Sequence, residues 1–368
     1  MNIIPLKDLI EDSAKELGRL QSGKQKIVKT GFECIDTHVG GLLPGDILLL
    51  SGLSSHGKSE FLFKLKENLM NIENNEDAKD YVYLDISLEM KMFNIFLRGV
   101  HRRLKKSKKR ILFEEFTDEE KEIVKAYYNS LEDERIFMVQ EKVTPRSFRD
   151  GVIAFAEEHK KKKAIFVSID HILLVSGNDK KAVLDEVVEM MNELKLIYGN
   201  LYFIILSQMN REVLKRSDDK NNKATPNSSD LFGSDFMQQA ASYSIIIFNA
   251  FKVGINQYMK VDPDFYDYLS EHFGEEDKKK GKISFETIGK LFYHVIKVRE
   301  GESVFKDIFI EDMQMDEETR TKLLNSRKEV VDTSVPTFDI KTPEPIFDAA
   351  YQKNTLNSLQ GEGFDMFD

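Results

Sequence analysis

The chain has 368 residues, a net charge of −10 and a single cysteine, which excludes an internal disulfide and a surface that is basic throughout. Its hydrophobic content of 41% and charged content of 32% are typical of a soluble globular protein with one α/β core and extensions, or with two small domains. One cysteine, together with the lack of a signal-peptide pattern or a membrane-spanning run, predicts a cytoplasmic protein that does not enter membranes.

The first predicted element is an amphipathic helix over Leu6–Leu20. Its apolar residues recur at helical spacing, but they offer too little surface for a domain of their own. A polar stretch, Gln21–Lys26, separates this helix from the rest of the chain. Because an isolated helix of this length is marginal in water, we expect it to dock on the core or on a neighbouring subunit.

The middle of the chain alternates strands with helices, which predicts a mostly parallel sheet with helices on both faces. Continuously apolar runs, typical of strands buried on both faces, are Ile47–Leu50, Tyr81–Ile86, Ala164–Ile169, Tyr202–Leu206, Ser244–Phe248 and Tyr293–Val298. Helices expected between them include Thr117–Leu131, Thr144–His159 and Lys181–Tyr198.

A phosphate-binding loop follows the first of these strands. Residues Gly52–Ser59 read GLSSHGKS and match G-x-x-x-x-G-K-[ST] in a strand–loop–helix setting, and this setting distinguishes a phosphate-binding loop from a Gly-Ser-rich turn with a chance lysine. Backbone N–H groups and the helix N-terminus of such a loop hold phosphates. We expect Lys58 to bridge the β- and γ-phosphates of ATP and the Ser59 hydroxyl to hold Mg²⁺. The remaining candidate nucleotide ligands in the loop are Ser54, Ser55, His56 and Gly57.

Two carboxylates follow predicted strands, at the sheet edge where α/β proteins bind their ligands. Asp170 ends the run Ala164–Ile169, which is the Walker B pattern that delivers one carboxylate beside Mg²⁺. Glu89 follows Tyr81–Ile86 and would face the same crevice. It is either the base that activates water or a helix-start residue that favours the helix dipole.

Gln208 ends another predicted strand and leads into a polar segment, Asn210–Ser234, that we expect to be a mobile loop. The Gln208 amide could donate to a γ-phosphate, and the loop could then move a bound polyanion. The alternative is a solvated surface loop. Candidate cations of the loop are Arg211, Lys215, Arg216, Lys220 and Lys223.

Two further groups of cations stand outside that loop. Lys297 and Arg299 lie two residues apart at the end of Tyr293–Val298, so strand alternation places both side chains on one face. They could stabilise transition-state charge, or they could be solvated edge residues. The dense basic run His101–Arg110 could contact nucleic acid, but such a run is more often a solvated face.

Together these motifs resemble the C-terminal ATPase domain of the DnaB-type replicative helicases, in order and spacing from about Thr30 to Gly301. Thr30–Asp36 and Gly40–Asp46 are similar to the family's approach to the phosphate loop. The other matching segments are Ser87–Met90 with Arg98 for S-L-E-M…R, Asp170–Leu173 imperfectly for D-Y-L-Q, Ser207–Arg211 for S-Q-L-N-R and Lys297–Gly301 for K-Q-R-N-G.

The resemblance implies a RecA-like fold and a hexameric ring that translocates on single-stranded DNA at the expense of ATP. It implies that Glu89 is the catalytic base, Arg98 binds nucleotide and Gln208 senses the γ-phosphate. Lys297 and Arg299 would act in trans on the ATP of the neighbouring subunit. The first helix would be the linker helix that docks on that neighbour. The expected domains are residues 1–29 (linker helix), 30–312 (ATPase domain), 313–332 (helical extension) and 333–368 (disordered tail).

The sequence departs from the family at three places. The family's helical N-terminal domain is missing, which would suit a compact helicase of a bacteriophage acting in the host cytoplasm. Asp230–Asp235 stands where the family has the DNA-contacting D-L-R-E-S-G. Without that cation, Phe232, Gly233 and Ser234 would contact DNA through an apolar surface and backbone N–H groups. An insertion within Gly254–Ile288 has no counterpart.

The tail Thr333–Asp368 is rich in proline and scattered acids, and its composition predicts disorder. Its last residues, Gly361–Asp368, place two aromatic side chains among acids. They could dock on a polymerase, primase or loader, or form a solubilising tail. Alternatives for the whole chain are a RecA-like recombinase or recombination mediator, and an ATPase switch that does not translocate.

Overall fold

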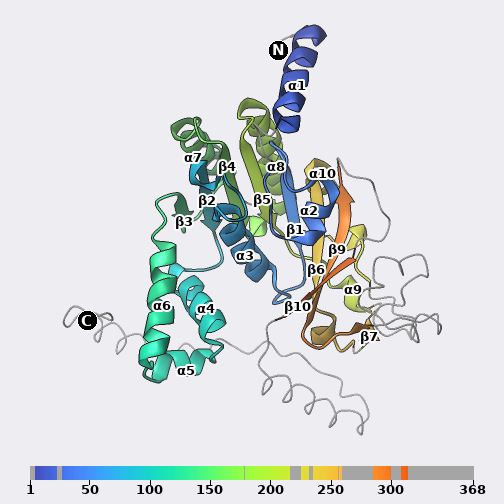
Figure 1. The fold of residues 1–368 in the computed structure, drawn as a ribbon. Coiled ribbons are helices and arrows are strands. Elements are labelled where there is room, and N and C mark those ends of the chain that lie inside the picture. Colours follow the sequence, from blue (N-terminus) through green and yellow to red (C-terminus); the bar gives the residue numbers. More distant parts are fainter. Residues whose placement is uncertain are drawn as a thin grey trace. The chain divides into compact units, whose positions relative to one another are not determined.

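The computed structural model describes residues 5–22, 27–177, 179–215, 225–231, 235–255, 257–258, 285–299 and 308–313. The chain divides into two compact units (Figure 1). The larger unit contains the segments Met1–Met92 and Glu134–Gln314, and the other contains the helical segment Phe93–Asp133. The expected helical extension, 313–332, lies almost entirely outside the described residues, and the tail, 333–368, lies wholly outside them.

The larger unit is built on a sheet with the strand order β10-β9-β6-β1-β5-β4-β2-β3 (Figure 1). Strands β1 to β6 pair in parallel, β9 pairs antiparallel with β6, and β10 pairs antiparallel with β9. The bounds are β1 Ile47–Ser51, β2 Tyr81–Ser87, β3 Ile136–Val139, β4 Ala164–Asp170, β5 Leu201–Leu206, β6 Tyr243–Phe248, β9 Lys290–Val298 and β10 Ile308–Asp312. Gln257–Tyr258 (β7) and Phe285–Glu286 (β8) form a separate pair.

Helices cover both faces of this sheet, as predicted. Alternate residues of β1 point to opposite faces: Ile47 and Leu49 pack into one hydrophobic cluster with α7 and α8, and Leu48 and Leu50 into another with α2 and α3. The helices of this unit are α1 Leu6–Gln21, α2 Glu33–Val39, α3 Lys58–Met70, α7 Pro145–Glu158, α8 Lys180–Ile197, α9 Glu212–Lys215 and α10 Asp235–Ala240. The mostly parallel α/β fold expected from the sequence, with helices on both faces of the sheet, is therefore confirmed.

The predicted elements are present with small shifts at their ends. The helix expected at Thr144 begins at Pro145, because Thr144 is its N-cap and accepts a hydrogen bond from the Ser147 backbone. Thr117 caps the preceding predicted helix, which begins at Asp118, in the same way. Strands β3 and β10 were not predicted: β3 has only four residues and is partly exposed, so it lacks the long apolar run of a central strand.

The helical unit consists of α4 Met92–Leu104, α5 Lys108–Phe113 and α6 Asp118–Leu131. Much of the basic run His101–Arg110 is engaged inside it. The Arg103 guanidinium lies over the Tyr127 ring, 3.8 Å from its centroid, and Lys106 forms an ion pair with Glu120. These contacts give Arg103 and Lys106 a structural role, while Lys105, Lys108 and Lys109 of the same run are exposed.

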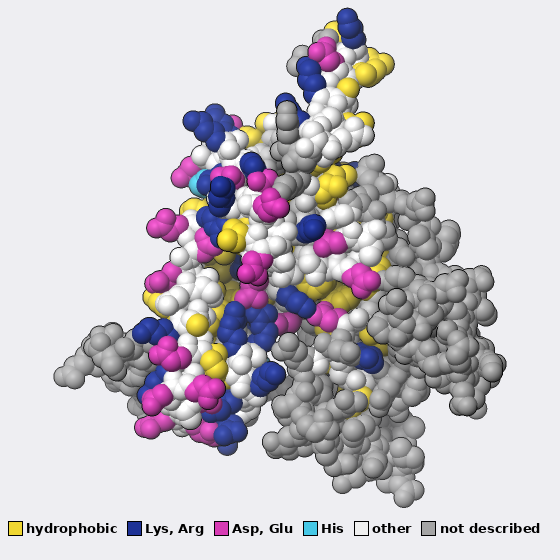
Figure 2. All heavy atoms as spheres, viewed as in Figure 1, with side chains coloured by type: hydrophobic (Ala, Val, Ile, Leu, Met, Phe, Trp, Pro, Cys, Tyr) yellow, Lys and Arg dark blue, Asp and Glu magenta, His cyan; other side chains and the backbone are white. Residues whose placement is uncertain are grey.

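Helix α1 is amphipathic, as predicted, but several of its apolar side chains are exposed. Leu6, Ile10 and Leu17 each keep more than half of their surface accessible, and Figure 2 shows hydrophobic side chains on this helix at the top of the view. A helix with an uncovered apolar face gains little stability by itself. No helix in the described part of the chain is long and apolar enough to cross a membrane.

Candidate nucleotide-binding site

The phosphate loop joins the central strand β1 to α3, as its motif predicts. Gly57 has a φ of 102° and Ser55 a φ of 63°, so the loop turns through left-handed conformations before α3 begins at Lys58. Gly52 lies close to the neighbouring strand β6, and a Cβ atom there would be 2.5 Å from the Ile247 carbonyl oxygen. The glycine at position 52 is therefore required by the packing of the loop against the sheet.

The Lys58 ammonium lies inside the loop. It donates hydrogen bonds to the carbonyl oxygens of Gly52 and Leu53, over 2.8 and 3.0 Å. Burial lowers the pKa of Lys58, while the carboxylates of Asp170 and Glu89 oppose that change. The structure thus brings three of the predicted site residues close enough to influence one another.

Asp170, at the end of β4, meets Ser59 across the site. The Ser59 hydroxyl donates to the Asp170 carboxylate over 3.3 Å. Burial, together with the nearby carboxylates of Glu89 and Asp85, raises the pKa of Asp170 to about 6. A cation would remove this electrostatic cost, and hydroxyl and carboxylate oxygens are the ligands that Mg²⁺ prefers.

The described residues hold no cluster of three His, Cys, Asp or Glu side chains that could bind a metal by themselves. A Mg²⁺ ion held by Ser59 and Asp170 would therefore take its remaining ligands from phosphate oxygens and water, as Mg²⁺ usually does at nucleotide sites. The residues present fit that arrangement.

Glu89 reaches the same edge of the sheet from β2. The backbone N–H of Leu88 donates to the Asp170 carbonyl over 2.6 Å, which holds the segment after β2 against the end of β4. The Glu89 side chain is exposed. Its carboxylate acts on the pKa values of both Lys58 and Asp170. This position suits a group that orients or activates water.

Gln208 lies beside the phosphate loop because β5 pairs with β1. The Met209 backbone N–H donates to the Gly52 carbonyl over 3.2 Å, and the Gln208 side chain is exposed. The segment after it is less irregular than expected, since it contains α9 and the short 3₁₀ turn Ser228–Asp230.

Only part of the predicted DNA-contacting loop is described. Arg211 is exposed, whereas Lys215 forms an ion pair with Glu212 over 2.6 Å on the surface of α9. The remaining candidates, Arg216, Lys223, Phe232, Gly233 and Ser234, lie outside the described residues.

His56 was a candidate nucleotide ligand, and its ring is engaged within the protein. Its Nδ1 accepts a hydrogen bond from the Asn249 backbone over 2.9 Å, and burial lowers its pKa to about 4. This contact ties the loop to the end of β6. Ser54 and Ser55 are exposed on the loop. Arg98 is exposed on α4, in the helical unit, and its nucleotide contact stays a prediction.

A buried polar network under the site was not anticipated from the sequence. Lys66 of α3 forms an ion pair with Asp85 of β2 over 2.6 Å, and Ser168 of β4 donates to the same carboxylate over 2.9 Å. The one signal in the sequence is an acid inside an otherwise apolar strand, Tyr81–Ile86. The network joins α3, β2 and β4 beneath Ser59 and Asp170.

Lys297 and Arg299 share one face at the end of β9, as predicted. The Lys297 ammonium donates to the Gln238 and Gln239 carbonyls, over 2.8 and 2.7 Å. The Arg299 guanidinium donates to the Gln239 and Ala240 carbonyls, over 2.6 and 3.0 Å. Both cations therefore lie on the last turn of α10, where exposed carbonyls attract positive charge.

These two cations are far from the phosphate loop of their own chain. The Arg299 backbone N–H donates to Ser242, and the Ser242 backbone N–H donates to Ile47, the first residue of β1. The phosphate loop follows the other end of that strand. Since the five residues of β1 span four steps of about 3.3 Å, its two ends are roughly 13 Å apart.

Residues 27–267 match the family model for the DnaB-like helicase C terminal domain. The chain belongs to this family. Among curated relatives, the replicative DNA helicase DnaB of Buchnera aphidicola subsp. Schizaphis graminum is 25% identical over 225 residues, covering 60% of this chain and 46% of that protein. The replicative DNA helicase DnaB of Rickettsia typhi is 25% identical over 231 residues, covering 60% and 44%. The chain thus spans about half the length of the curated relatives it matches.

Solved structures show the same fold. The ATPase domain of G40P superposes with a TM-score of 0.61 and 14% identity, over 86% of this chain and all of that one. A DnaB-like replicative helicase, from a structure that describes its interactions with primase, gives a TM-score of 0.56 and 17% identity, over 84% of this chain and 64% of that one. The family assignment agrees with the resemblance carried by the motifs.

Proposed function

We propose that this protein is a replicative DNA helicase that hydrolyses ATP with Mg²⁺ and translocates on single-stranded DNA as a hexameric ring. One observation carries the proposal. The residues suited to phosphate chemistry form two groups at opposite ends of the sheet: Lys58, Ser59 and Asp170 at one end, and Arg299 with Lys297 at the other.

The separation of the two groups supports a nucleotide site that two neighbouring subunits form together. An arginine that stabilises phosphoryl-transfer charge must touch the nucleotide, which Arg299 cannot do within its own subunit. A head-to-tail contact between copies would bring Arg299 to the loop of a neighbour, and repetition of that contact gives a ring when the rotation between copies closes on itself. The exposed apolar face of α1 supplies a further surface for such an assembly.

The roles of the residues follow from their positions. Ser59 and Asp170 would hold Mg²⁺, which neutralises charge on the β- and γ-phosphates. Lys58 would turn from the loop carbonyls to the phosphates, and Glu89 would take the proton of the attacking water. Gln208 is next to Met209, whose backbone N–H is hydrogen-bonded to the phosphate loop. The Gln208 side chain would lose its contact when the γ-phosphate leaves, and the segment that carries Arg211 would then move.

Binding of primase, a polymerase or a loader through Gly361–Asp368 stays a prediction, because that segment lies outside the described residues. The structural relative described with primase makes primase the first partner to test. Deletion of Gly361–Asp368 should leave ATP hydrolysis intact and weaken capture of purified primase. Equal capture by the full and truncated chains would contradict the prediction.

Unwinding of a forked DNA substrate tests the proposed function. The parent should unwind in the presence of ATP and Mg²⁺, and single-stranded DNA should stimulate its ATPase. Glu89→Gln should keep nucleotide binding and lose both activities. Turnover unaffected by DNA would indicate an ATPase switch, and open helical filaments in negative-stain images would indicate a recombinase.

A further inference from the structure

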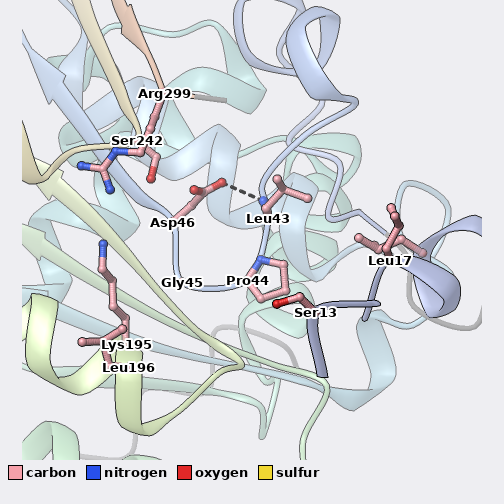
Figure 3. Close-up of a pocket in the computed structure, with 11 residues that line it drawn as sticks. Ser13, Leu17, Leu43, Pro44, Gly45, Asp46, Lys195, Leu196, Ser242 and Arg299 are labelled. Atoms are coloured by element: carbon pink, nitrogen blue, oxygen red, sulfur yellow. Dashed lines mark hydrogen bonds between the residues drawn. The ribbon is translucent and has the colours of Figure 1, made fainter. Parts of the chain in front are cut away.

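A pocket of about 450 Å³ lies at the end of the sheet opposite the phosphate loop (Figure 3). The turn Leu43–Asp46, the end of α8 and Arg299 line it, and residues of α1 form another wall. The residues before β1 and β6 come together here, so the pocket belongs to the same region as the predicted trans-acting cations.

Three cations gather around this pocket. Figure 3 shows the Lys195 ammonium pointing toward the Arg299 guanidinium from α8, and Lys297 precedes Arg299 on the same face of β9. Burial and then Arg299 lower the pKa of Lys195, and the Asp46 carboxylate opposes that change. Burial, Arg299 and Lys195 lower the pKa of Lys297. Asp46 is the one acid among the described lining residues, and its carboxylate already accepts the Leu43 backbone N–H over 2.7 Å.

The three cations differ in how their donors are used. Lys297 and Arg299 each donate to two carbonyls of α10. Lys195 makes no hydrogen bond or ion pair with any part of the chain that the structure describes, so its ammonium keeps all its donors available. Its position is fixed by α8, where Met191 and Leu194 are fully buried in the core.

Three cations held together with one acid among them cost free energy, and an added anion reduces that cost. The anion is not the nucleotide of the same subunit, because that binds at the other end of β1. It has to come from another molecule that reaches this end of the sheet. In the ring proposed above, that molecule is the neighbouring subunit with its bound ATP.

We propose that Lys195 contacts the γ-phosphate of ATP bound to the neighbouring subunit, as a third trans-acting cation beside Lys297 and Arg299. The inference rests on the proposed function. A charge-assisted hydrogen bond from a preorganised ammonium stabilises charge that grows in the transition state, so the contribution is to turnover rather than to ATP affinity. Lys195 belongs to none of the sequence motifs, which is why only its position in the fold reveals it.

The first experiment measures DNA-stimulated ATP hydrolysis by Lys195→Met, Lys195→Arg and Lys181→Met. Lys181 is an exposed lysine in the first turn of the same helix and serves as the matched control. Lys195→Met should lose at least about tenfold in kcat with KM little changed, as for removal of one preorganised donor. Lys195→Arg should restore most of the activity, and Lys181→Met should match the parent. Activity of Lys195→Met equal to that of Lys181→Met would overturn the inference.

A DNA phosphate is the other anion that could reach this pocket. Fluorescence anisotropy with labelled single-stranded DNA separates the two sources. Unchanged DNA affinity in Lys195→Met, with slower turnover both with and without DNA, supports the nucleotide contact. Weaker DNA binding with unchanged turnover in the absence of DNA would overturn it.

Mixed rings test whether Lys195 acts in trans. Lys58→Ala subunits lack a working phosphate loop but carry Lys195, so rings co-expressed from Lys58→Ala and Lys195→Met should hydrolyse ATP faster than either variant alone. Rings of Lys58→Ala with Arg299→Ala test the shared site itself. If ATP hydrolysis recovers in rings of Lys58→Ala with Arg299→Ala but not in rings of Lys58→Ala with Lys195→Met, the role of Lys195 is overturned and the proposed function stands. Recovery in neither would overturn both.

Discussion

Ser59, the second residue of α3, donates a hydrogen bond to Asp170, the last residue of β4, over 3.3 Å. The two residues are separated by β5 in the sheet and by 111 positions in the chain, so their contact is produced by the strand order β1-β5-β4. It brings a hydroxyl and a buried carboxylate to the point where a P-loop protein holds Mg²⁺.

Asp170→Asn should separate stability from activity. The folded pKa of Asp170, about 6, lies above its ordinary value of 3.8, so the folded state loses stability as the pH rises from about 4 to 6. At pH 7 the neutral variant should therefore raise the free energy of unfolding of the nucleotide-free protein by ~1–3 kcal/mol. It should also lose Mg²⁺-dependent ATP hydrolysis. Urea unfolding and an ATPase assay check the two effects, and a variant less stable than the parent would contradict the first.

Lys66→Met should destabilise the protein strongly because it leaves the Asp85 carboxylate buried without its cation. Removing one partner of a buried ion pair costs about 3–5 kcal/mol. The double variant Lys66→Met/Asp85→Asn removes both charges, so it should regain part of the loss. Free energies of unfolding from urea titrations of both variants check this. A double variant as unstable as the single one would show that the charge is not the cause.

Gly52→Ala should abolish ATP binding because its Cβ would lie 2.5 Å from the Ile247 carbonyl oxygen and push the loop away from β6. Gly151→Ala is the matched control. Gly151 lies within α7, and no heavy atom of a neighbouring group is within 4 Å of a Cβ placed there. That change should instead stabilise the helix by about 0.5–1 kcal/mol. Titration with a fluorescent ATP analogue and thermal unfolding compare them. Normal ATP binding by Gly52→Ala would refute the steric argument.

His56→Asn should make stability less sensitive to acid. The pKa of His56 is about 4 in the folded protein against an ordinary 6.5, so its contribution to stability is lost as the pH falls from 6.5 toward 4. Between pH 7 and 5 this loss amounts to about 1–2 kcal/mol. The Asn side-chain oxygen can still accept the Asn249 backbone N–H but does not titrate. Urea unfolding at both pH values should show a smaller decrease for the variant, and an equal decrease would exclude His56 as the source.

Much of the nucleotide site could be predicted because its residues follow apolar runs. Asp170, Glu89 and Gln208 each lie at or just after the end of a strand, and Lys58 follows the loop that leaves β1. Parallel strands bring such ends to one edge. The residues that were missed lack this relation to a motif. Asp85 and Ser168 lie inside strands, and their partner Lys66 is on a helix, so nothing in their spacing connects them.

The phosphate loop, the carboxylates beside it and the alternation of strands and helices in a mostly parallel α/β core could be predicted from the sequence, because they depend on local spacing and hydrophobic pattern. The antiparallel pairing of β9 with β6 could not, and it is known from the folded structure alone. That direction places Arg299 at the far end of the sheet from its own phosphate loop and beside Lys195 of α8. Strand direction and contacts between distant segments are set by packing of the whole core, so short-range sequence patterns do not predict them.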